Sequence, residues 1–446
     1  MQSQPPPVLF GAAQGGTDIT ANERRARWSW AEASVWTDRM LAALENGVKG
    51  NVWFSLIDKV QKPANLWAAW CKSARNKGSA GVDRITIEQF AREAEANVEH
   101  LAEQLRQGSY QPKPILRTFI PKPDGTKRPL GIPTVRDRIV QGAVRQVIEP
   151  VFEKEFACHS YGFRPGKGCK DALRRVDQLL RSGHRYVVDA DLKSYFDTIP
   201  HDRLMAEVGK RVADGPVLKL IESFLSARIM DGLDQWTPTA GAPQGAVLSP
   251  LLSNIYLNPL DHQMADAGWE MVRYADDFVI LCQSKEQAAA ALDAVKSWTA
   301  QAGLTLHPDK TRIADTRTEP FEFLGYCFDR GRKWPRKKSM AKLKDTIRAK
   351  TRRKEGRSLP VIIQDVKRTM RGWFGYFKHS HRYTFSKLDG WVRERLRSLL
   401  RKRHKLRGKA KGFDHLRWKN VFFERQGFYS LKEAHARACQ SVKAAH

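Results

Sequence analysis

The chain has 446 residues and a net charge of +29, and 41% of its residues are hydrophobic. These values describe a folded protein of two or three domains with an anionic partner, and they exclude a disordered chain. The six cysteines form no Cys-x-x-Cys pair, so we expect neither a disulfide framework nor a zinc site, and a reducing, cytoplasmic setting fits best. No apolar run reaches the roughly 18 residues of a membrane span and no signal-peptide pattern is found, so we expect no membrane partner.

The positive charge is concentrated in the last quarter of the chain. From Arg330 to the C-terminus there are 36 Lys and Arg residues against 8 Asp and Glu, a net charge of +28, so the preceding residues are close to neutral. Solubility does not require such a local excess, which indicates a nucleic acid partner. Binding to phosphates should weaken as salt rises, because it releases counterions.

Residues 1–20 are rich in Gln, Pro, Gly and Ala, a composition that predicts a disordered tail. A helical pattern follows over 22–75, a loop is expected at 76–81, and the pattern is helical again over 87–107. A strand over 115–120, a Pro- and Gly-containing turn and a return strand at 130–132 predict a hairpin.

The middle of the chain combines strands and helices. A β-branched strand at 185–188 runs into Asp191, and apolar strands at 269–274 and 278–282 form a second predicted hairpin. Ser284 then caps a helix whose apolar face comprises Leu292, Val295 and Trp298. This order predicts an α+β domain with a mainly antiparallel sheet.

Beyond Arg330 we expect helices and no further strands. The segment Trp391–Arg403 predicts an amphipathic helix with one apolar face. Three arginines spaced by four residues form a basic stripe on another face, and we expect them to bind nucleic acid: Arg393, Arg397 and Arg401.

Two adjacent aspartates, Asp276 and Asp277, lie in the turn of the second hairpin. An aspartate pair is common in ordinary turns, but here both flanking strands are apolar and Asp191 ends a third strand. Like charges so close together repel unless a cation joins them, and carboxylate oxygens suit Mg²⁺. The three aspartates therefore predict a catalytic two-metal site, in which one ion activates a 3′-hydroxyl and the other stabilises the leaving pyrophosphate.

Several sequence blocks, which follow one another in the order typical of the family, resemble the reverse transcriptases encoded by group II introns, also called maturases. The catalytic motif of that family matches Tyr274-Ala275-Asp276-Asp277, and its first metal ligand matches Asp191. The resemblance extends from about Gly47 to the C-terminus, with further matching blocks at Asn76–Asp83, Ile120–Pro133, Ser160–Pro165, Pro243–Pro250, Gly303–Thr311, Phe323–Gly325 and Arg371–Phe377.

The resemblance implies a right-hand polymerase with fingers, a palm built on an antiparallel sheet, and an all-helical thumb and maturase domain. The boundaries that we expect are a tail at 1–20, an N-terminal extension with the start of the fingers at 21–110, fingers at 111–180, a palm at 181–330 and a basic thumb and maturase domain at 331–446.

The resemblance also implies roles for individual side chains. Lys122 and Arg128, on the two arms of the first hairpin, would hold the triphosphate of the incoming nucleotide. Phe196 would block a 2′-hydroxyl, although a core aromatic is an alternative that does not exclude this role. Gln244 would contact the nucleotide sugar or the primer end, and Lys310 either contacts the primer backbone or is a solvated lysine.

The predicted activity is RNA-directed DNA polymerisation with dNTPs and Mg²⁺, for which Mn²⁺ can substitute. The expected partners are a group II intron RNA, an RNA template with a DNA primer, and a DNA target, in a bacterial cytoplasm at the nucleoid. The chain resembles the short class C members that lack an endonuclease domain, so the primer would come from elsewhere. The sequence does not indicate an oligomeric state.

Two alternatives remain beside an intron-encoded enzyme with both activities. The first is a domesticated reverse transcriptase in repair or phage defence, which the protein sequence does not separate from an intron protein. The second is an RNA-binding splicing factor with an inactive polymerase, which would be expected to lack one of the three aspartates.

Overall fold

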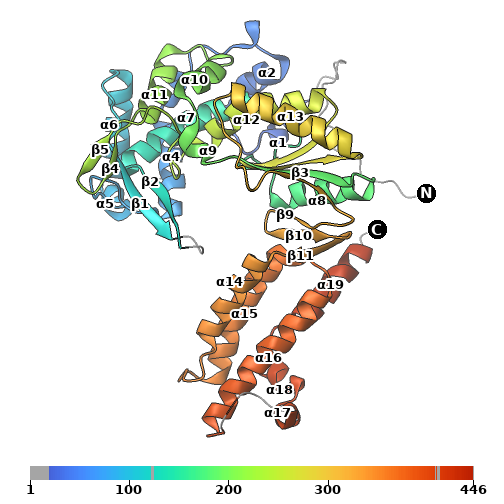
Figure 1. Ribbon diagram of the computed structural model, residues 1–446. Coiled ribbons are helices and arrows are strands. Elements are labelled where there is room, and N and C mark those ends of the chain that lie inside the picture. Colours follow the sequence, from blue (N-terminus) through green and yellow to red (C-terminus); the bar gives the residue numbers. More distant parts are fainter. Residues whose placement is uncertain (1–19, 122–124, 407, 409–411, 445–446) are drawn as a thin grey trace. The chain divides into compact units, whose positions relative to one another are not determined.

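A computed structural model describes residues 20–121, 125–406, 408 and 412–444. The chain divides into two compact units, one of Met1–Ser182 with Ala190–Arg312 and one of Gly183–Asp189 with Ile313–His446 (Figure 1). The predicted tail lies, except for Thr20, outside the described residues. Among the helices that are described, none is long and apolar enough to cross a membrane. The domain boundaries expected from the sequence stay predictions.

The first unit begins with short helices where the sequence predicted a helical region over 22–75. Thr37 starts a new helix by accepting a hydrogen bond from the Met40 backbone, and Pro63 begins another at its first turn, so the region is divided. The segment around Phe54, within this predicted helical region, is a loop, and Phe54 is 64% exposed. The elements are α1 Ala21–Arg27, α2 Asp38–Asn46, η1 Lys49–Asn51, α3 Ile57–Val60, α4 Pro63–Asn76, α5 Ile87–Ala91 and α6 Ala94–Arg106.

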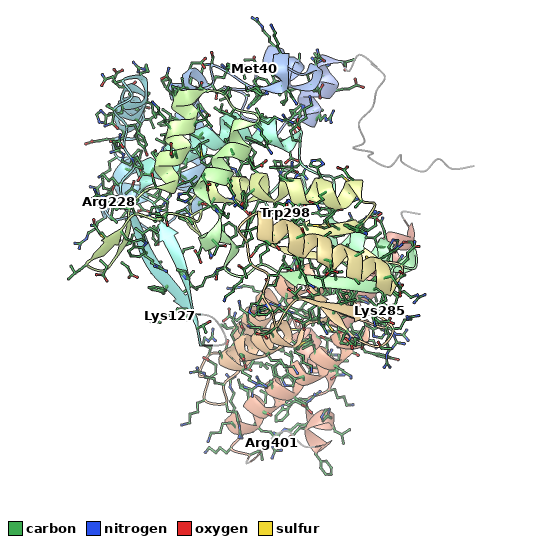
Figure 2. All side chains as sticks on the ribbon, turned by 45° about the horizontal axis from the view of Figure 1, so that its top comes forward. Met40, Lys127, Arg228, Lys285, Trp298 and Arg401 are labelled. Atoms are coloured by element: carbon green, nitrogen blue, oxygen red, sulfur yellow. The ribbon has the colours of Figure 1, made fainter. Side chains whose placement is uncertain are left out.

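The first predicted hairpin is confirmed as β1 (Ile115–Pro121) and β2 (Lys127–Ile132), which pair antiparallel. Lys127 lies at the outer end of this hairpin (Figure 2). Two short strands that were not predicted extend the sheet to the order β2-β1-β4-β5, namely β4 (Ile229–Asp231) and β5 (Asp234–Trp236). Strand β4 runs parallel to β1, so part of this sheet is not antiparallel.

Helix α7 (Val135–Glu153) is the central helix of the first unit. Thr134 caps its start by accepting a hydrogen bond from the Asp137 backbone, and most of its side chains are buried. It packs against α3, α4 and α12 (Ser249–Asp266). A helix that is covered on several sides is a rigid support for the loops at its ends.

The second predicted hairpin is confirmed as β6 (Glu270–Tyr274) and β7 (Asp277–Cys282). Strand β3 (Tyr186–Asp191) is the neighbour of β7 in the strand order. Helices α8, α12 and α13 pack against the hairpin (Figure 1). The remaining elements of this unit are α8 Cys169–Arg181, α9 Tyr195–Thr198, α10 His201–Gly209, α11 Gly215–Leu225 and α13 Lys285–Gln301.

Ser284 caps α13 as predicted, by accepting a hydrogen bond from the Gln287 backbone. The apolar face of this helix is only partly as predicted. Val295 is buried, but Leu292 and Trp298 are half-buried. Smaller residues take the closest positions against the sheet because they let the helix backbone approach it.

The second unit contains a three-stranded sheet, and its last strand, β11, lies beyond Arg330, where the sequence predicted no strand. Strand β10 (Tyr326–Asp329) pairs antiparallel with β9 (Phe321–Phe323) and with β11 (Arg332–Pro335). Arg330 and Gly331 both have positive φ, of 47° and 73°, which is the geometry of a tight two-residue hairpin. The prediction was wrong here because arginine is an uncommon residue at the first turn position. Strand β8 spans Arg312–Asp315.

The rest of the second unit is helical, as predicted. Its core is formed by apolar residues spaced three and four apart, such as Ile362, Val366 and Met370 of α15 against Leu388, Val392 and Leu396 of α16. The elements are α14 Lys337–Lys350, α15 Leu359–Phe377, α16 Tyr383–Arg403, α17 Gly412–Arg417, α18 Asn420–Arg425 and α19 Leu431–Ala444.

Asp389, a buried residue of α16, joins this helix to the start of α19. Its carboxylate accepts hydrogen bonds from Ser430 Oγ at 2.9 Å and from the backbone nitrogens of Leu431 and Lys432, both at 3.0 Å. We expect Asp389→Ala to lower the free energy of unfolding by about 1–3 kcal/mol, because it leaves buried donors unsatisfied. Urea denaturation measures this. Glu394→Ala, on the exposed face of the same helix, should change it by less than about 0.5 kcal/mol; an equal effect of both variants would contradict the assignment.

Candidate active site

The turn that carries the adjacent aspartates joins β6 to β7. Tyr274 and Asp277 are the last paired residues of the hairpin, so Ala275 and Asp276 make the connection. Ala275 is buried and has a φ of 59°, a left-handed conformation that residues with a side chain seldom adopt. Such a conformation costs free energy and persists only where neighbouring groups impose it.

The side chain of Arg273 imposes this conformation from inside the protein. Arg273 has no exposed surface, and its guanidinium donates to the Asp261 carboxylate at 2.7 and 2.5 Å. It also donates to Asn254 Oδ1 and to the carbonyl oxygen of Ala275, both at 2.9 Å. A buried ion pair of this kind is costly to break, so the guanidinium is a fixed anchor for the turn.

The segment that begins at His159 lies beside β6 and contacts the same turn. The Arg273 nitrogen donates to the His159 carbonyl at 3.0 Å, and the Tyr161 nitrogen donates to the Arg273 carbonyl at 2.8 Å. The next residue, Gly162, is so close to the turn that any side chain would collide with the backbone nitrogen of Ala275. Glycine is therefore required at position 162 for steric reasons.

The structure brings Asp191 close enough to Asp276 for its charge to act on the Asp276 carboxyl. Burial raises the pKa of the Asp276 carboxyl above its ordinary value, and the negative charge of Asp191 raises it further. Positive charge on Arg128 and on Arg273 acts in the opposite direction. A site that disfavours its own negative charges is one that a cation would stabilise.

Lys310 supplies positive charge next to Asp191. Lys310 Nζ donates to Asp191 Oδ2 at 2.5 Å, and the His307 backbone nitrogen donates to the Asp191 carbonyl at 2.7 Å. The lysine predicted to be either solvated or on the primer backbone thus lies at the aspartate cluster. Its side chain is 59% exposed, so the pair is open to solvent and exchangeable.

The donor set here consists of hard carboxylate oxygens, which fit a divalent ion such as Mg²⁺. Among the described residues, no group of three His, Cys, Asp or Glu side chains is arranged to hold a metal ion. Mg²⁺ takes one or two carboxylates together with substrate phosphates and water in many phosphoryl-transfer sites. The residues therefore fit an ion whose coordination is completed by a bound nucleotide.

A cavity of about 410 Å³ is lined by Phe196, Asp197, Gln244, Arg117 and Trp236, among others. Phe196 is 8% exposed and packs edge-to-face on Tyr195, with ring centroids 5.5 Å apart. It is therefore both a core aromatic and a wall of the cavity, so the two interpretations of this residue from the sequence are compatible.

Arg128 links this cavity to the aspartate turn. Its Nε donates to Gln244 Oε1 at 2.7 Å. Burial raises the pKa of Asp197, and the charges of Arg117 and Arg128 oppose that rise, so Arg128 also lies near Asp197. The charge of Arg128 also opposes the raised pKa of Asp276, so one guanidinium is within electrostatic reach of both Asp197 in the cavity and Asp276 in the turn. Lys122, its predicted companion, lies outside the described residues.

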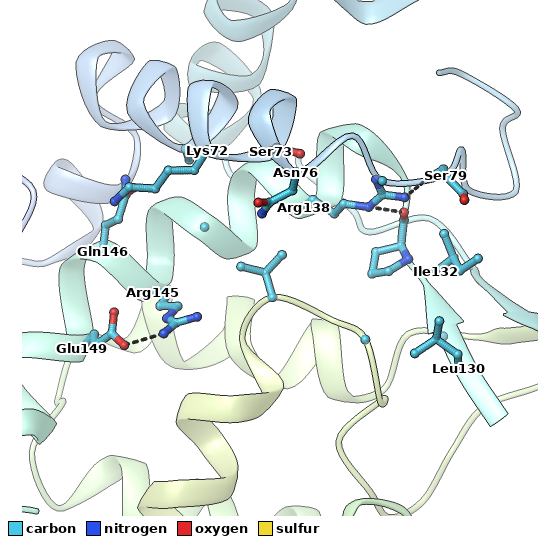
Figure 3. A pocket seen from close by; sticks show the side chains of 17 residues that line it. Lys72, Ser73, Asn76, Ser79, Leu130, Ile132, Arg138, Arg145, Gln146 and Glu149 are labelled. Carbon is cyan, nitrogen blue, oxygen red and sulfur yellow. Dashed lines mark hydrogen bonds and ion pairs between the residues drawn. The ribbon is translucent and has the colours of Figure 1, made fainter. Parts of the chain in front are cut away.

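A second cavity, of about 630 Å³, is shown in Figure 3, and Leu130 and Ile132 of β2 are among the residues that line it. Leu130 and Gly131 line both cavities. The second cavity is also lined by cationic and polar groups, including Lys72, Arg138 and Arg145. Arg138 donates to the carbonyls of Pro133 and Ser79, and Arg145 Nη2 is 2.6 Å from Glu149 Oε1.

Sequence reasoning missed three of these residues: Arg273, Asp197 and Arg138. Arg273 directly precedes the Tyr274 block, and an arginine inside an apolar strand is a signal that it is buried and paired. Asp197 directly follows Phe196 and could have been included on that ground. Arg138 gives no signal, because its role depends on a loop about sixty residues earlier in the chain.

The predicted basic stripe of α16 does not face solvent. Arg397 is 2% exposed and donates to the Trp418 carbonyl at 3.0 Å. Arg401 pairs with Asp414 at 2.9 Å, and Arg393 is 3.5 Å from Glu424. Figure 2 marks Arg401 in the helical unit. The expected exposed stripe is therefore not formed, because the three guanidinium groups contact residues in or next to α17 and α18.

The family model described as "Reverse transcriptase (RNA-dependent DNA polymerase)" matches residues 120–328. A second model, "Group II intron, maturase-specific domain", matches residues 340–418. The first match contains the three aspartates, and the second contains the whole of α15 and of α16.

Two curated proteins are similar over long segments. Protein YkfC of Escherichia coli is 34% identical over 300 residues, which are 58% of this chain and 78% of that protein. The group II intron-encoded protein LtrA of Lactococcus lactis is 36% identical over 203 residues, 45% of this chain and 33% of LtrA. A solved "Partial Cas6-RT-Cas1--Cas2 complex" is 26% identical over 55% of this chain and 41% of its own, with a TM-score of 0.36, too low to bear on the fold.

We expect Arg273→Met to lower the free energy of unfolding by about 3–5 kcal/mol, because the Asp261 carboxyl group would be left buried without its partner. Urea denaturation of the full chain checks this value. The double variant Arg273→Met, Asp261→Leu should recover most of the stability. Lys296→Met removes an exposed ion pair with Asp293 and serves as the matched control, with a change of less than about 1 kcal/mol. A single-variant effect no larger than this control would refute the anchoring role.

Proposed function

This chain belongs to the reverse transcriptase and maturase family of group II introns, and we propose that it copies RNA into DNA and assists the folding of an intron RNA. The chain spans 78% of YkfC but only 33% of LtrA. The activity, substrates and partners of the whole protein are therefore proposals.

The observation that carries the polymerase proposal is the position of Arg128. One guanidinium lies near Asp276 of the turn and near Asp197 of the cavity, and it is bonded to Gln244. A nucleotide whose triphosphate joins the turn to the cavity would meet this cation. Arg128 suits that role because its planar group can hold phosphate oxygens in pairs.

In this proposal Asp191, Asp276 and Asp277 are the catalytic carboxylates. The family depends on divalent metal ions, and we propose Mg²⁺, with Mn²⁺ as a substitute. When bound, such ions lower the pKa of the primer hydroxyl and neutralise charge on the departing pyrophosphate. Lys310 would release Asp191 as the ions enter and then lie beside the primer end. The anchored turn keeps the carboxylates preorganised, which avoids reorganisation during the reaction.

Selection of the nucleotide falls to the 410 Å³ cavity. Arg128, with Lys122 from the opposite arm of the hairpin, would hold the triphosphate. Phe196 would exclude a 2′-hydroxyl because its ring is buried and cannot move aside. Gln244 would contact the sugar, and its backbone is held close by Gly131, whose nitrogen donates to the Gln244 carbonyl at 2.7 Å.

The second cavity suits the template strand. Leu130 and Gly131 line both the second cavity and the nucleotide cavity. A template base at this shared wall would therefore lie next to the incoming nucleotide. Lys72, Arg138 and Arg145 would meet its phosphates. Arg138 also joins the loop at Ser79 to the hairpin, so it would position one edge of the template path.

The maturase role rests on the match of residues 340–418 and on the positive charge of the last quarter of the chain. We propose group II intron RNA as the partner, with a DNA target in intron mobility. We propose that the protein acts in the cytoplasm, in line with the bacterial source of these two relatives, and at the nucleoid, where its DNA target would be.

We expect Asp276→Asn combined with Asp277→Asn to abolish cDNA synthesis on a primed RNA template, because neutral amides cannot hold the ions. The decrease should exceed about 1000-fold, as for other charge-stabilising groups of an active site. Primer extension measures it, and RNA affinity of the same variant should stay within about twofold of the unchanged chain.

The matched control is Asp293→Asn, which makes the same chemical change at an exposed position of α13 and should leave synthesis intact. Synthesis at the normal rate in the double variant would remove the carboxylates from the mechanism.

Phe196→Ala should raise the incorporation of rNTPs relative to dNTPs by about 10-fold or more, because the wall against the 2′-hydroxyl is removed. Competitive primer extension with mixed nucleotides gives the ratio. Tyr195→Phe is the control: it keeps its ring against Phe196 and loses only the 2.7 Å hydrogen bond to the Ser253 carbonyl. Unchanged discrimination in Phe196→Ala would remove its gate role.

A further inference from the structure

The three arginines that were predicted to bind nucleic acid contact other residues of the second unit, here called the helical unit. RNA binding by this unit would therefore require a different surface. Arg397 is buried, and Arg393 and Arg401 lie beside carboxylates. The net positive charge of this part of the chain remains, so it must act through other groups. A surface with both cations and exposed rings is the strongest candidate, since unpaired RNA is recognised by phosphate contacts and by stacking.

Three aromatic rings form a continuous row at the turn between α15 and α16. The Trp334 ring of β11 lies 4.7 Å from the His381 ring, and the His381 ring lies 5.0 Å from the Tyr383 ring, centroid to centroid. The His381 backbone nitrogen donates to the Lys333 carbonyl at 2.7 Å, which fixes the turn against β11. The row is therefore built by two separate elements, and its spacing is held by the backbone.

The row opens to solvent at Tyr383, which is 51% exposed, while Trp334 and His381 are half-buried. A ring that packs only in a core would be covered, as Phe385 is two residues later. The outer ring is thus presented on a support of two further rings.

Two exposed arginines flank the row. Arg382 lies 5.4 Å from the centre of the Tyr383 ring. The charges of Arg332 and Arg382, together with burial as the main cause, lower the pKa of His381, so both cations lie close to the row. The lowered pKa disfavours the charged form of His381, and its ring supports the Tyr383 ring by direct contact.

We propose that Trp334, His381 and Tyr383 form a stacking platform for an unpaired base of RNA, with Arg332 and Arg382 on the adjoining phosphates. An acidic peptide would use the arginines but not a row of rings. A regular duplex would use the arginines but keeps its bases stacked on one another. This proposal deepens the proposed maturase role, because it names unpaired bases as what the helical unit binds.

The test uses the full chain with its polymerase site filled by a primer–template duplex whose primer end is blocked. A short single-stranded RNA with one 2-aminopurine is then added, since the fluorescence of this base falls when it stacks. We expect quenching with the unchanged chain, and an affinity about 5- to 100-fold weaker in Tyr383→Ala, the effect of removing one stacked base. Tyr383→Phe keeps the ring and should bind within about twofold.

The matched control for the removal of an exposed ring is Phe413→Ala, which truncates an aromatic side chain that is 85% exposed elsewhere in the same unit. It should leave the quenching unchanged. Arg332→Gln with Arg382→Gln should keep the quenching at saturation but reduce the slope of log affinity against log salt by about 0.7 for each phosphate that is no longer neutralised.

Quenching that persists in Tyr383→Ala, or that falls equally in Phe413→Ala, would overturn the proposal. A DNA strand of the same sequence that binds more tightly than the RNA would overturn the assignment to RNA. Primer extension by Tyr383→Ala should stay normal, and quenching by Asp276→Asn with Asp277→Asn should also stay normal. These two results separate a failure of the platform from a failure of the polymerase proposal.

Discussion

The fully buried contact between Arg273 and Asp261 is the constraint on which the aspartate turn depends. Two charges without solvent are costly, and they are stable here because the guanidinium is bonded to Asp261, Asn254 and the Ala275 carbonyl together. That last bond holds Ala275 in a left-handed conformation, and the turn then presents Asp276 at the edge of β7. The buried ion pair thus stabilises the strained conformation of the turn, so the turn is preorganised before any ligand binds.

Cations lie within reach of three carboxylates of the site, Asp191, Asp276 and Asp197. Lys310 pairs with Asp191, and Arg128 acts on both Asp276 and Asp197. Both cations are exposed, so they can exchange partners at little cost, in contrast to the buried Arg273. The difference in burial separates two kinds of function: the buried cation fixes backbone geometry, and the exposed cations are available to substrate phosphates.

Burial also separates the arginines of the helical unit into structural and exposed groups. A count of charges along α16 treats Arg393, Arg397 and Arg401 as equivalent to any solvated cation, but each is bonded to or lies beside residues of the 414–424 segment. Arginine can be buried because its planar group satisfies several acceptors at once. Excess charge in a sequence therefore identifies the class of partner, whereas the surface that meets the partner depends on which cations the fold has already used.

The local features of this protein could be predicted from its sequence: the two hairpins, the Ser284 cap, the Asp276–Asp277 turn and the family blocks around them. These follow from short-range rules, because hydrophobic period, turn residues and capping act over a few neighbours. Which distant groups meet became known only from the folded chain. Its packing places Arg128 beside Gln244, Arg138 against the Ser79 loop, Gly162 under Ala275, and α17 and α18 over the arginines of α16. Such contacts depend on the packing of the whole chain, which no local pattern encodes.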